Sequence, residues 1–365
     1  MQILTSVSKY LLLALLSCAL FLTWYGSTQI TLTTPLPPEE IESGASTYSY
    51  SYSYSTPGAS TSRALASITA ADVLQVPSDV FKKIKGTPLA HTSDSIWKTL
   101  SKEFKLNHNV QASEVQKEIR RIQADHTRFY AILNAAAPYI YYIHQQTRAK
   151  NLPAEIALIP YVESEFNPND RSTKGATGLW QLMVGTAHEL GVQVKAGYDG
   201  RRDVVASTRA ALAYFKDLGE LFKGNWYLAI AAYNCGQGRV ANTIKKAKSS
   251  NYWQLTKLPT ETKYYVPRLM AVAAVIKNPE KYGVKLPEIK NKPYFTEVKS
   301  KKIVNLAKVA QSTGVNIKTL NSLNPDYNKG VITKGGAYSL LVPIEQVEKV
   351  KLSLPILETS KITKK

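Results

Sequence analysis

A glutamate at the end of an apolar stretch is the residue of this sequence with the clearest potential for acid/base chemistry. Glu163 is followed directly by Ser164. If the apolar stretch is helical, Glu163 shares a face with Ile159 and Phe166. A carboxyl group on such a face loses solvation, its pKa rises, and it can act as a general acid. Taken alone, a glutamate at a helix end is usually only a solvated charge.

Three later segments combine amide, aromatic and glycine residues: Gly175–Gln181, Ala231–Gly238 and Glu261–Pro267. Glycine lets a backbone approach a ligand closely, and a side-chain amide can hydrogen-bond a sugar amide or hydroxyl. Each segment alone is a weak signal, but the ordered set is specific. The candidate substrate-binding residues are Ser164, Gly178, Gln181, Tyr233, Asn234, Glu261 and Tyr265.

This ordered set resembles the soluble-lytic-transglycosylase superfamily, which shares a lysozyme-like fold with goose-type lysozyme. The matching motifs are Glu163-Ser164, Gly178-Leu179-Trp180-Gln181, Ala232-Tyr233-Asn234 and Glu261-Thr262-Lys263-Tyr264-Tyr265-Val266. The segment from Tyr198 to Asp203 is similar to the membrane-bound lytic murein transglycosylase D type. The resemblance covers residues 76–285 and, more weakly, 292–345.

The resemblance implies a cleavage of peptidoglycan that consumes no water. In such enzymes one glutamate protonates the glycosidic oxygen between N-acetylmuramic acid and N-acetylglucosamine. It then takes the proton of the muramyl 6-hydroxyl, which attacks C1 and closes a 1,6-anhydro ring. By this resemblance Glu163 is the acid/base, the other candidates line the cleft, and Glu261 anchors or polarises it. Ordinary glycosidases use two carboxylates.

Two alternative functions remain open at this point. A lysozyme-like muramidase of the same fold would hydrolyse the bond and would need a second carboxylate, for which Glu261 or Asp203 could be proposed. A non-catalytic peptidoglycan-binding protein would need no acid at all, and the intact motif set argues against it.

The N-terminus predicts export to the bacterial cell envelope, on the periplasmic side. Lys9 precedes an apolar run from Tyr10 to Tyr25, so residues 1–25 are expected to be a signal peptide or membrane anchor. Cys18 resembles a lipoprotein processing site, although the residues after it stay apolar. Residues 26–75 contain prolines and a Tyr/Ser alternation, which favour a flexible low-complexity linker.

The rest of the chain predicts a mainly α fold. Residues 76–149 show helical spacing and form a helical N-terminal extension, and residues 150–285 form the lysozyme-like catalytic domain. Residues 292–345 predict strand, helix, helix and strand, a small α+β module. That module resembles a degenerate LysM repeat through Leu323-Asn324-Pro325. Residues 346–365 begin as a short helix and end as a basic tail.

The charge of the chain indicates a polyanionic partner. The formal net charge is +19 over 365 residues, which fits nucleic acid, a lipid surface or an acidic polymer. No nucleic-acid recognition motif accompanies it, so the expected partners are peptidoglycan glycan strands, with the membrane reached through the N-terminal segment. The five histidines and two cysteines form no metal-ligand motif. We expect no metal, no organic cofactor and a monomer.

Overall fold

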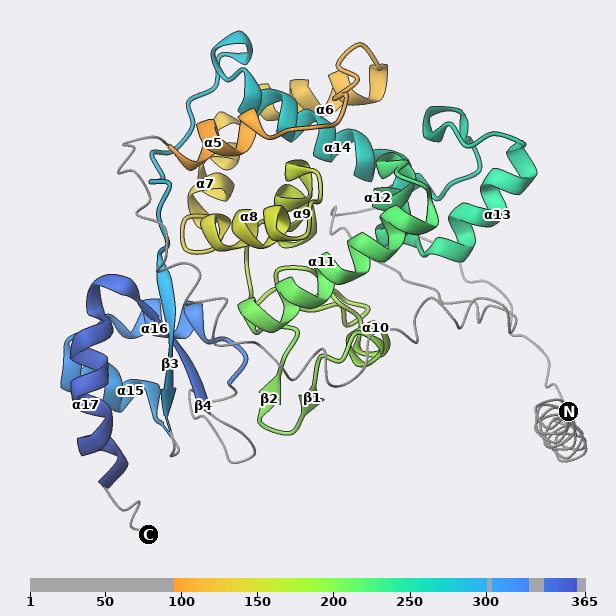
Figure 1. Ribbon diagram of the computed structural model, residues 1–365. Coiled ribbons are helices and arrows are strands. Elements are labelled where there is room, and N and C mark those ends of the chain that lie inside the picture. Colours follow the sequence, from red (N-terminus) through yellow and green to blue (C-terminus); the bar gives the residue numbers. More distant parts are fainter. Residues whose placement is uncertain (1–94, 301–303, 328–337, 360–365) are drawn as a thin grey trace, which may run out of the picture. The chain divides into compact units, whose positions relative to one another are not determined.

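The computed structural model describes residues 95–300, 304–327 and 338–359 (Figure 1). The predicted signal peptide or anchor, the linker at 26–75 and the first part of the helical extension lie outside these residues. Within the described ranges, no helix is long and apolar enough to cross a membrane. The expected mainly α fold with a small α+β module is confirmed.

Four helices form the extension that precedes the candidate site. They are α5 (Ile96–Lys102), α6 (Ser113–Ala124), α7 (His126–Ala135) and α8 (Ile140–Ala149). The apolar residues that recur at helical spacing are the buried ones: Trp97 and Leu100 on α5, and Val115 and Ile119 on α6. The 3.6-residue period therefore predicted correctly which face of each helix packs inward.

A second group of helices carries the candidate motifs. It comprises η1 (Ala154–Leu158), α9 (Ile159–Ser164), α10 (Val184–Glu189), α11 (Val204–Leu221), α12 (Trp226–Cys235), α13 (Gln237–Ala247), η2 (Tyr252–Gln254), α14 (Thr260–Lys277) and η3 (Glu280–Tyr282). Between α10 and α11, β1 (Val194–Lys195) and β2 (Tyr198–Asp199) pair as a short antiparallel hairpin.

Helix α14 lies at the centre of this group. Its residues from Leu269 to Ile276 are all buried, and it contacts α5, α6, α9 and α12. A helix that is apolar all round must be surrounded by other elements. Residues of α14 therefore face several elements, and Tyr265 on its second turn is directed towards α9.

The apolar stretch that precedes Glu163 differs from the single helix expected. It begins as the 3-10 helix η1 and continues as the short α-helix α9 from Ile159. Pro160, in the first turn of α9, has no N–H to donate back into the preceding turn. A proline is favoured in the first turn of a helix, and the α-helical part of the stretch begins next to it.

The C-terminal module is a two-stranded sheet with helices. β3 (Phe295–Ser300) and β4 (Tyr338–Pro343) are antiparallel, with Phe295 opposite Pro343 and Ser300 opposite Tyr338. The helices are α15 (Leu306–Thr313), α16 (Ile317–Leu323), η5 (Ile344–Gln346) and α17 (Val347–Thr359). The predicted β-α-α-β order is found. Val350 of α17 lies in the module core with Val309 and Leu340, so α17 packs as part of the module.

Contacts between this module and the helical part involve tyrosines. The Tyr139 hydroxyl donates to the Ser322 carbonyl at 2.8 Å, and the Tyr142 and Phe295 rings lie 5.3 Å apart. On the hairpin, Asp199 N–H donates to the Asp326 carbonyl at 3.0 Å. Tyr139 and Tyr142 thus pack partly against the module.

Candidate active site

Glu163 is a buried carboxyl group beside a buried tyrosine. It lies in the last turn of α9 and is 2% exposed. The Tyr265 hydroxyl, from α14, donates to Glu163 Oε1 at 2.6 Å. The two residues are 102 positions apart in the chain, and the packing of α9 against α14 brings them together. A short hydrogen bond to a buried carboxyl holds that group in one orientation.

The chain turns away immediately after the helix that carries Glu163. Glu165 and Phe166 have left-handed backbone angles, with φ of 53° and 59°. Phe166 is buried, whereas the Glu165 side chain is 49% exposed and its Oε1 lies 2.5 Å from Arg128 Nη2. The two neighbouring acids therefore have different surroundings, and Glu163 alone is enclosed.

Ser164 and Tyr233 both hold the backbone of the segment 178–181. The Ser164 hydroxyl donates to the Leu179 carbonyl at 2.9 Å, and the Tyr233 hydroxyl donates to the Trp180 carbonyl at 2.8 Å. The Tyr233 ring stacks on Phe215 of α11, with centroids 4.4 Å apart. Both hydroxyls are thus engaged with the protein backbone in this structure.

Gln181 is anchored through its amide nitrogen. Nε2 donates to the Gly178 carbonyl at 2.9 Å and lies 3.3 Å from the Asp170 carbonyl. Its Oε1 is buried and has no hydrogen-bond partner among the residues that the structure describes. A buried acceptor without a partner is costly, and because Gln181 is 1% exposed, a ligand reaches this oxygen only if the surrounding segment moves.

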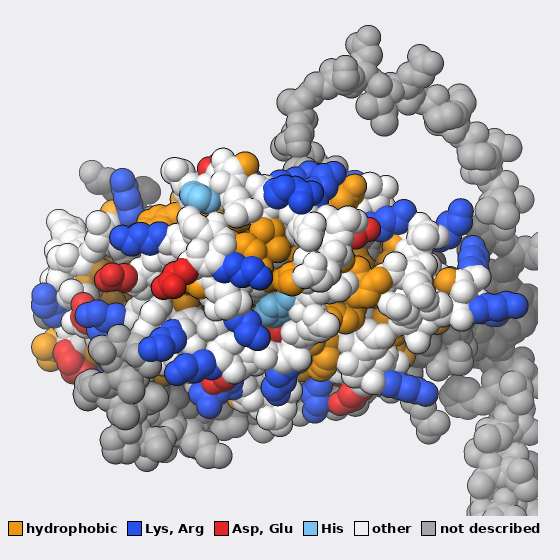
Figure 2. Space-filling model, turned by 90° about the horizontal axis from the view of Figure 1, so that it is seen from above, with side chains coloured by type: hydrophobic (Ala, Val, Ile, Leu, Met, Phe, Trp, Pro, Cys, Tyr) orange, Lys and Arg blue, Asp and Glu red, His pale blue; other side chains and the backbone are white. Residues whose placement is uncertain are grey.

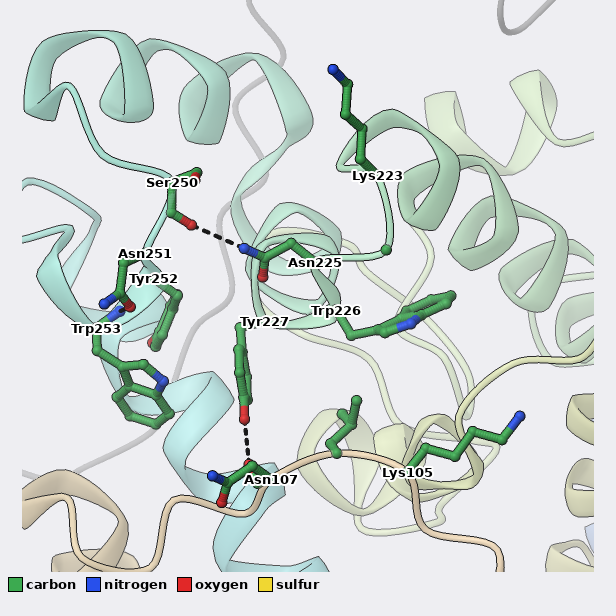
Figure 3. Close-up of a pocket in the computed structure, with 12 residues that line it drawn as sticks. Lys105, Asn107, Lys223, Asn225, Trp226, Tyr227, Ser250, Asn251, Tyr252 and Trp253 are labelled. Atoms are coloured by element: carbon green, nitrogen blue, oxygen red, sulfur yellow. Dashed lines mark hydrogen bonds between the residues drawn. The ribbon is translucent and has the colours of Figure 1, made fainter.

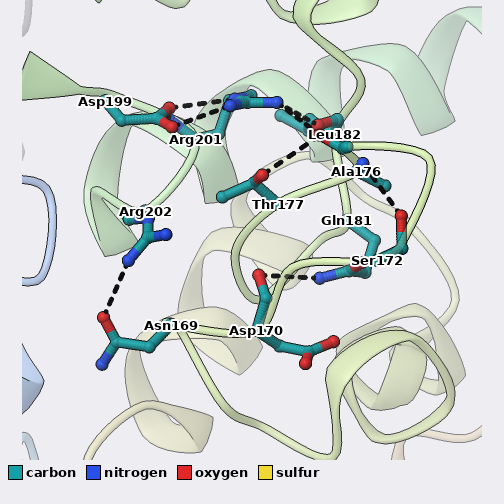
Figure 4. A network of polar contacts seen from close by, with 11 residues as sticks. Asn169, Asp170, Ser172, Ala176, Thr177, Gln181, Leu182, Asp199, Arg201 and Arg202 are labelled. Atoms are coloured by element: carbon teal, nitrogen blue, oxygen red, sulfur yellow. Dashed lines mark hydrogen bonds and ion pairs between the residues drawn. The ribbon is translucent and has the colours of Figure 1, made fainter.

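A buried arginine binds backbone carbonyl groups on both flanks of this segment (Figure 4). Arg201 is 4% exposed and makes two hydrogen bonds to the Asp199 carboxylate, at 2.9 and 2.8 Å. Its Nη1 donates to the Gly175 carbonyl at 2.8 Å and lies 3.3 Å from the Leu182 carbonyl. The planar guanidinium can bind a carboxylate and carbonyls at once. Arg201 therefore joins the hairpin to Gly175 and Leu182, which flank the segment 178–181.

Asn234 and Glu261 form a second polar pair at the far end of α12. Asn234 Nδ2 donates to Glu261 Oε1 at 2.8 Å, and the Thr262 hydroxyl donates to Asn234 Oδ1 at 2.7 Å. Burial raises the pKa of Glu261, and the hydrogen bond from Asn234 opposes that shift. The asparagine is therefore held from both sides by the start of α14.

Asp203, the other carboxylate proposed from the sequence, is engaged in the fold. It is the N-cap of α11, where Oδ1 accepts hydrogen bonds from the N–H groups of Val205 and Ala206, both at 2.8 Å. Its Oδ2 accepts one from the Tyr198 hydroxyl at 3.0 Å. An aspartate at this position stabilises the first turn of a helix.

Two family models match separate parts of the chain. Residues 140–256 match the family described as the Transglycosylase SLT domain, and residues 294–359 match the Lytic transglycosylase MltD, LysM-like domain. The chain carries an SLT domain followed by an MltD-type LysM-like domain.

Individual relatives differ in how much of the chain they match. Membrane-bound lytic murein transglycosylase D of Escherichia coli is 34% identical over 273 residues, which are 74% of this chain and 60% of that protein. Membrane-bound lytic murein transglycosylase F of Shewanella oneidensis is 33% identical over 33% of this chain and 27% of its own length. The chain thus spans less than two thirds of either relative.

Two solved structures also match part of the chain. One is an inactive mutant of lytic transglycosylase Slt from Pseudomonas aeruginosa, 27% identical over 40% of this chain and 25% of its own, with a TM-score of 0.33. The other is the 70 kDa soluble lytic transglycosylase of Escherichia coli, 22% identical over 50% of this chain and 32% of its own, with a TM-score of 0.36.

The candidate residues fall into three groups in space. Glu163 lies with Tyr265, and Asn234 lies with Glu261. The remaining candidates, Ser164, Gly178, Gln181 and Tyr233, make or hold the segment 178–181.

Sequence analysis missed two contributors to the SLT domain site. Arg201 and Asp199 were part of a segment noted for its similarity to the D type, but no role was assigned to either. The direct contact of Tyr265 with Glu163 was also not expected, because the sequence shows only a tyrosine in the cleft. The signal that could have indicated the Arg201–Asp199 contact is an arginine two residues after an aspartate.

Proposed function

We propose that this chain is a peptidoglycan lytic transglycosylase that uses Glu163 as its single acid/base. The observation that carries the proposal is the buried Glu163 carboxyl with the Tyr265 hydroxyl 2.6 Å from Oε1. The SLT domain match and the 34% identity to a lytic murein transglycosylase support it. Burial disfavours the charged carboxylate, so the group is suited to donate a proton first.

In the proposed cycle no atom enters from water. Glu163 donates its proton to the glycosidic oxygen, the C1–O bond breaks, and the N-acetylglucosamine end leaves with a hydroxyl. The resulting carboxylate then takes the proton of the muramyl 6-hydroxyl as that oxygen bonds to C1. The ring closes to a 1,6-anhydro end, and Glu163 is protonated again. Tyr265 orients the carboxyl and stabilises its charged form between the two steps.

Other parts of the site bind and orient the sugar in this proposal. Gln181 Oε1 accepts a hydrogen bond from a sugar amide or hydroxyl, and Asn234 and Glu261 line the cleft. Ser164 and Tyr233 act mainly by fixing the position of the segment 178–181 through their hydrogen bonds to its carbonyl groups. The C-terminal module binds glycan and keeps the catalytic domain on its insoluble substrate.

We also infer that the protein works in the cell envelope, on the periplasmic side. The relatives are named membrane-bound murein transglycosylases, and the apolar run from Tyr10 to Tyr25 is the segment proposed to export or anchor the chain.

Analysis of the chemical ends of digested peptidoglycan tests the proposed reaction. Mass spectrometry of walls treated with the full chain should find 1,6-anhydromuramyl ends. Glu163→Gln should abolish their formation, because the amide cannot donate or accept the proton. Reducing muramyl ends would instead mean hydrolysis with a second carboxylate. Absence of any new ends from the unaltered protein would overturn the enzymatic proposal.

A further inference from the structure

A pocket lies at the end of α12 opposite to the Asn234 end. Its volume is about 700 Å³, and it is formed by three stretches: 105–107, 223–227 and 250–253. Trp226 opens α12 and Asn234 lies in its last turn, so the two ends are about 12 Å apart along the axis. The residues between them, from Leu228 to Cys235, are buried. None of the pocket residues belongs to the site described above.

Aromatic rings form the walls of this pocket (Figure 3). Trp253 packs edge-on against Tyr227 and Tyr252, with centroid distances of 5.6 and 5.1 Å. Trp226 rests on α11, where a Cβ at Gly219 would come within 2.5 Å of its ring. Trp226, Tyr227 and Trp253 are each partly exposed. The electron-rich face of such a ring attracts the C–H groups on the face of a sugar.

The polar groups of the pocket are amides and amines. Asn107 and Asn251 are exposed at its edge, and Figure 3 shows the side chains of Lys105 and Lys223 extending on either side of Trp226. None of the described residues that line the pocket is acidic. The lining therefore favours a ligand with apolar faces, amide or hydroxyl groups, and negative charge.

Hydrogen bonds hold the three stretches in place. Asn225 Nδ2 donates to the Ser250 carbonyl at 2.9 Å, and the Tyr227 hydroxyl donates to the Asn107 carbonyl. Behind the first stretch, buried Glu155 accepts hydrogen bonds from Lys105 N–H at 3.2 Å and Leu106 N–H at 2.8 Å. A pocket whose walls are already fixed loses little entropy when a ligand binds.

We propose that this pocket is an auxiliary binding site for an acidic glycan of N-acetylated amino sugars, namely a second stretch of peptidoglycan. Sugar rings stack on Trp226 and Trp253, the acetamido groups meet the asparagines, and lactyl or stem-peptide carboxylates meet Lys105 and Lys223. Basic side chains outnumber acidic ones on the face seen in Figure 2, and the formal net charge of the chain is +19, which agrees with an anionic polymer as the ligand. This site rests on the proposed function only for the identity of its ligand.

Cosedimentation with purified insoluble peptidoglycan tests binding at the pocket. Each variant is made in the full chain with Glu163→Gln, so that binding is measured without cleavage. Trp253→Ala should weaken wall binding about tenfold. The double change Lys105→Glu and Lys223→Glu, which is confined to exposed side chains, should weaken it similarly and reduce its dependence on salt.

Matched changes elsewhere serve as controls. Tyr130→Ala removes an aromatic ring that is 41% exposed on α7, and Lys277→Glu reverses an exposed charge at the end of α14. Both should leave wall binding within about twofold of the parent. Pocket variants that sediment like these controls would overturn the proposal, and the charge-reversal result decides it if Trp253→Ala does not fold.

A second measurement separates the pocket from the catalytic cleft. In the active background, the pocket variants should keep kcat/KM for a short soluble glycan fragment within about twofold, and lose rate only on insoluble walls. An equal loss on both substrates would place the pocket within the cleft and contradict an auxiliary site. Failure of the unaltered protein to form anhydromuramyl ends would refute the proposed function, while binding by the Glu163→Gln proteins would still report on the pocket.

Discussion

At the scale of single residues, the contact between Tyr265 and Glu163 is the feature most closely tied to the proposed chemistry. Both side chains are 2% exposed, so their hydrogen bond is protected from water and is stronger than an exposed one. A phenol can donate to the carboxylate and remain in place when that group is protonated. The pair thus suits a carboxyl that must give up a proton and recover it within one cycle.

Removal of one oxygen atom tests this contact. Tyr265→Phe should lower kcat about 10- to 100-fold with little change in KM, because a hydrogen bond to a charged group contributes about 1.5–3 kcal/mol. Tyr264→Phe is the matched control, since Tyr264 is the neighbouring residue and is partly exposed. Steady-state kinetics on soluble glycan strands measures both. Equal rates for the two variants would mean that Tyr265 has only a packing role.

At the scale of elements, the segment 175–182 is held from three sides. Ser164 of α9 and Tyr233 of α12 bind its carbonyl groups, and Arg201, which follows the β1–β2 hairpin, binds Gly175 and Leu182. Irregular backbone keeps one conformation only when its surroundings determine it. The position of Gln181 therefore depends on helices that are distant from it in the sequence.

Two glycines of this segment offer a controlled test of its packing. Gly178 and Gly175 both have φ of +87°, but a Cβ at Gly178 would lie 1.9 Å from the Arg201 carbonyl oxygen, whereas one at Gly175 would meet nothing within 4 Å. Each change to alanine carries the cost of a left-handed residue, about 1–2 kcal/mol. Gly178→Ala should lose further stability and most activity, because the backbone around Gln181 must move.

Urea unfolding and activity measurements on Gly175→Ala and Gly178→Ala test whether the close approach of Arg201 to Gly178 determines the conformation of the segment. Their difference isolates the steric clash, since the backbone angle is the same in both. If Gly178→Ala is as stable and as active as Gly175→Ala, the approach of Arg201 does not determine the conformation of the segment. From the sequence, the glycines of this segment were expected to let the backbone approach a ligand. In this structure Gly178 lets the backbone approach the Arg201 carbonyl group.

At the scale of the whole molecule, the buried Asp326 and the partly buried Asp203 lie near the contact between the SLT domain and the LysM-like module. Burial raises the pKa of Asp326 well above its ordinary value, and the charges of Asp203 and Asp199 raise it further. Burial likewise raises the pKa of Asp203. The rings of Tyr198 and Tyr327 lie beside them, with centroids 5.6 Å apart and a tilted arrangement. The contact therefore contains carboxyl groups that oppose each other's ionisation.

The sign of the resulting pH dependence is set by the raised pKa. An acid with a higher pKa in the folded than in the unfolded state binds its proton more tightly when folded. Stability is then gained as the pH falls through the folded pKa of Asp326 and is lost as the pH rises through it. Asp326→Asn should raise the Tm at pH 7 by roughly 3 °C or more, and the difference from the parent should vanish below the ordinary value of 3.8.

Thermal unfolding of the full chain from pH 3 to pH 8 measures this difference. Glu288→Gln removes an exposed carboxylate and serves as the control, with no change expected across the range. A Tm of Asp326→Asn that follows the parent at every pH would show that the burial of this carboxyl does not limit the stability of the protein.

The sequence by itself determined the helical segments and the likeness to lytic transglycosylases. Helical periodicity records which residues face inward, and Trp97, Leu100 and Val115, in the range with helical spacing, are buried. Motif order placed Glu163 among the candidates, because that order resembles the one found in the soluble-lytic-transglycosylase superfamily. The hydrophobic pattern predicted one helix across residues 154–164 and missed the change from η1 to α9 next to Pro160. The cause of that change is nevertheless local, because proline lacks an N–H group.

Only the tertiary structure decided what each candidate contacts. The partner of a side chain is set by packing between elements far apart in the chain, and no local pattern records it. Tyr265 binds Glu163, whereas the hydroxyls of Ser164 and Tyr233 bind backbone carbonyls. Arg201 gained a role because the hairpin returns to the segment 175–182. The sequence could name the candidate acid, and the fold decided which groups surround it.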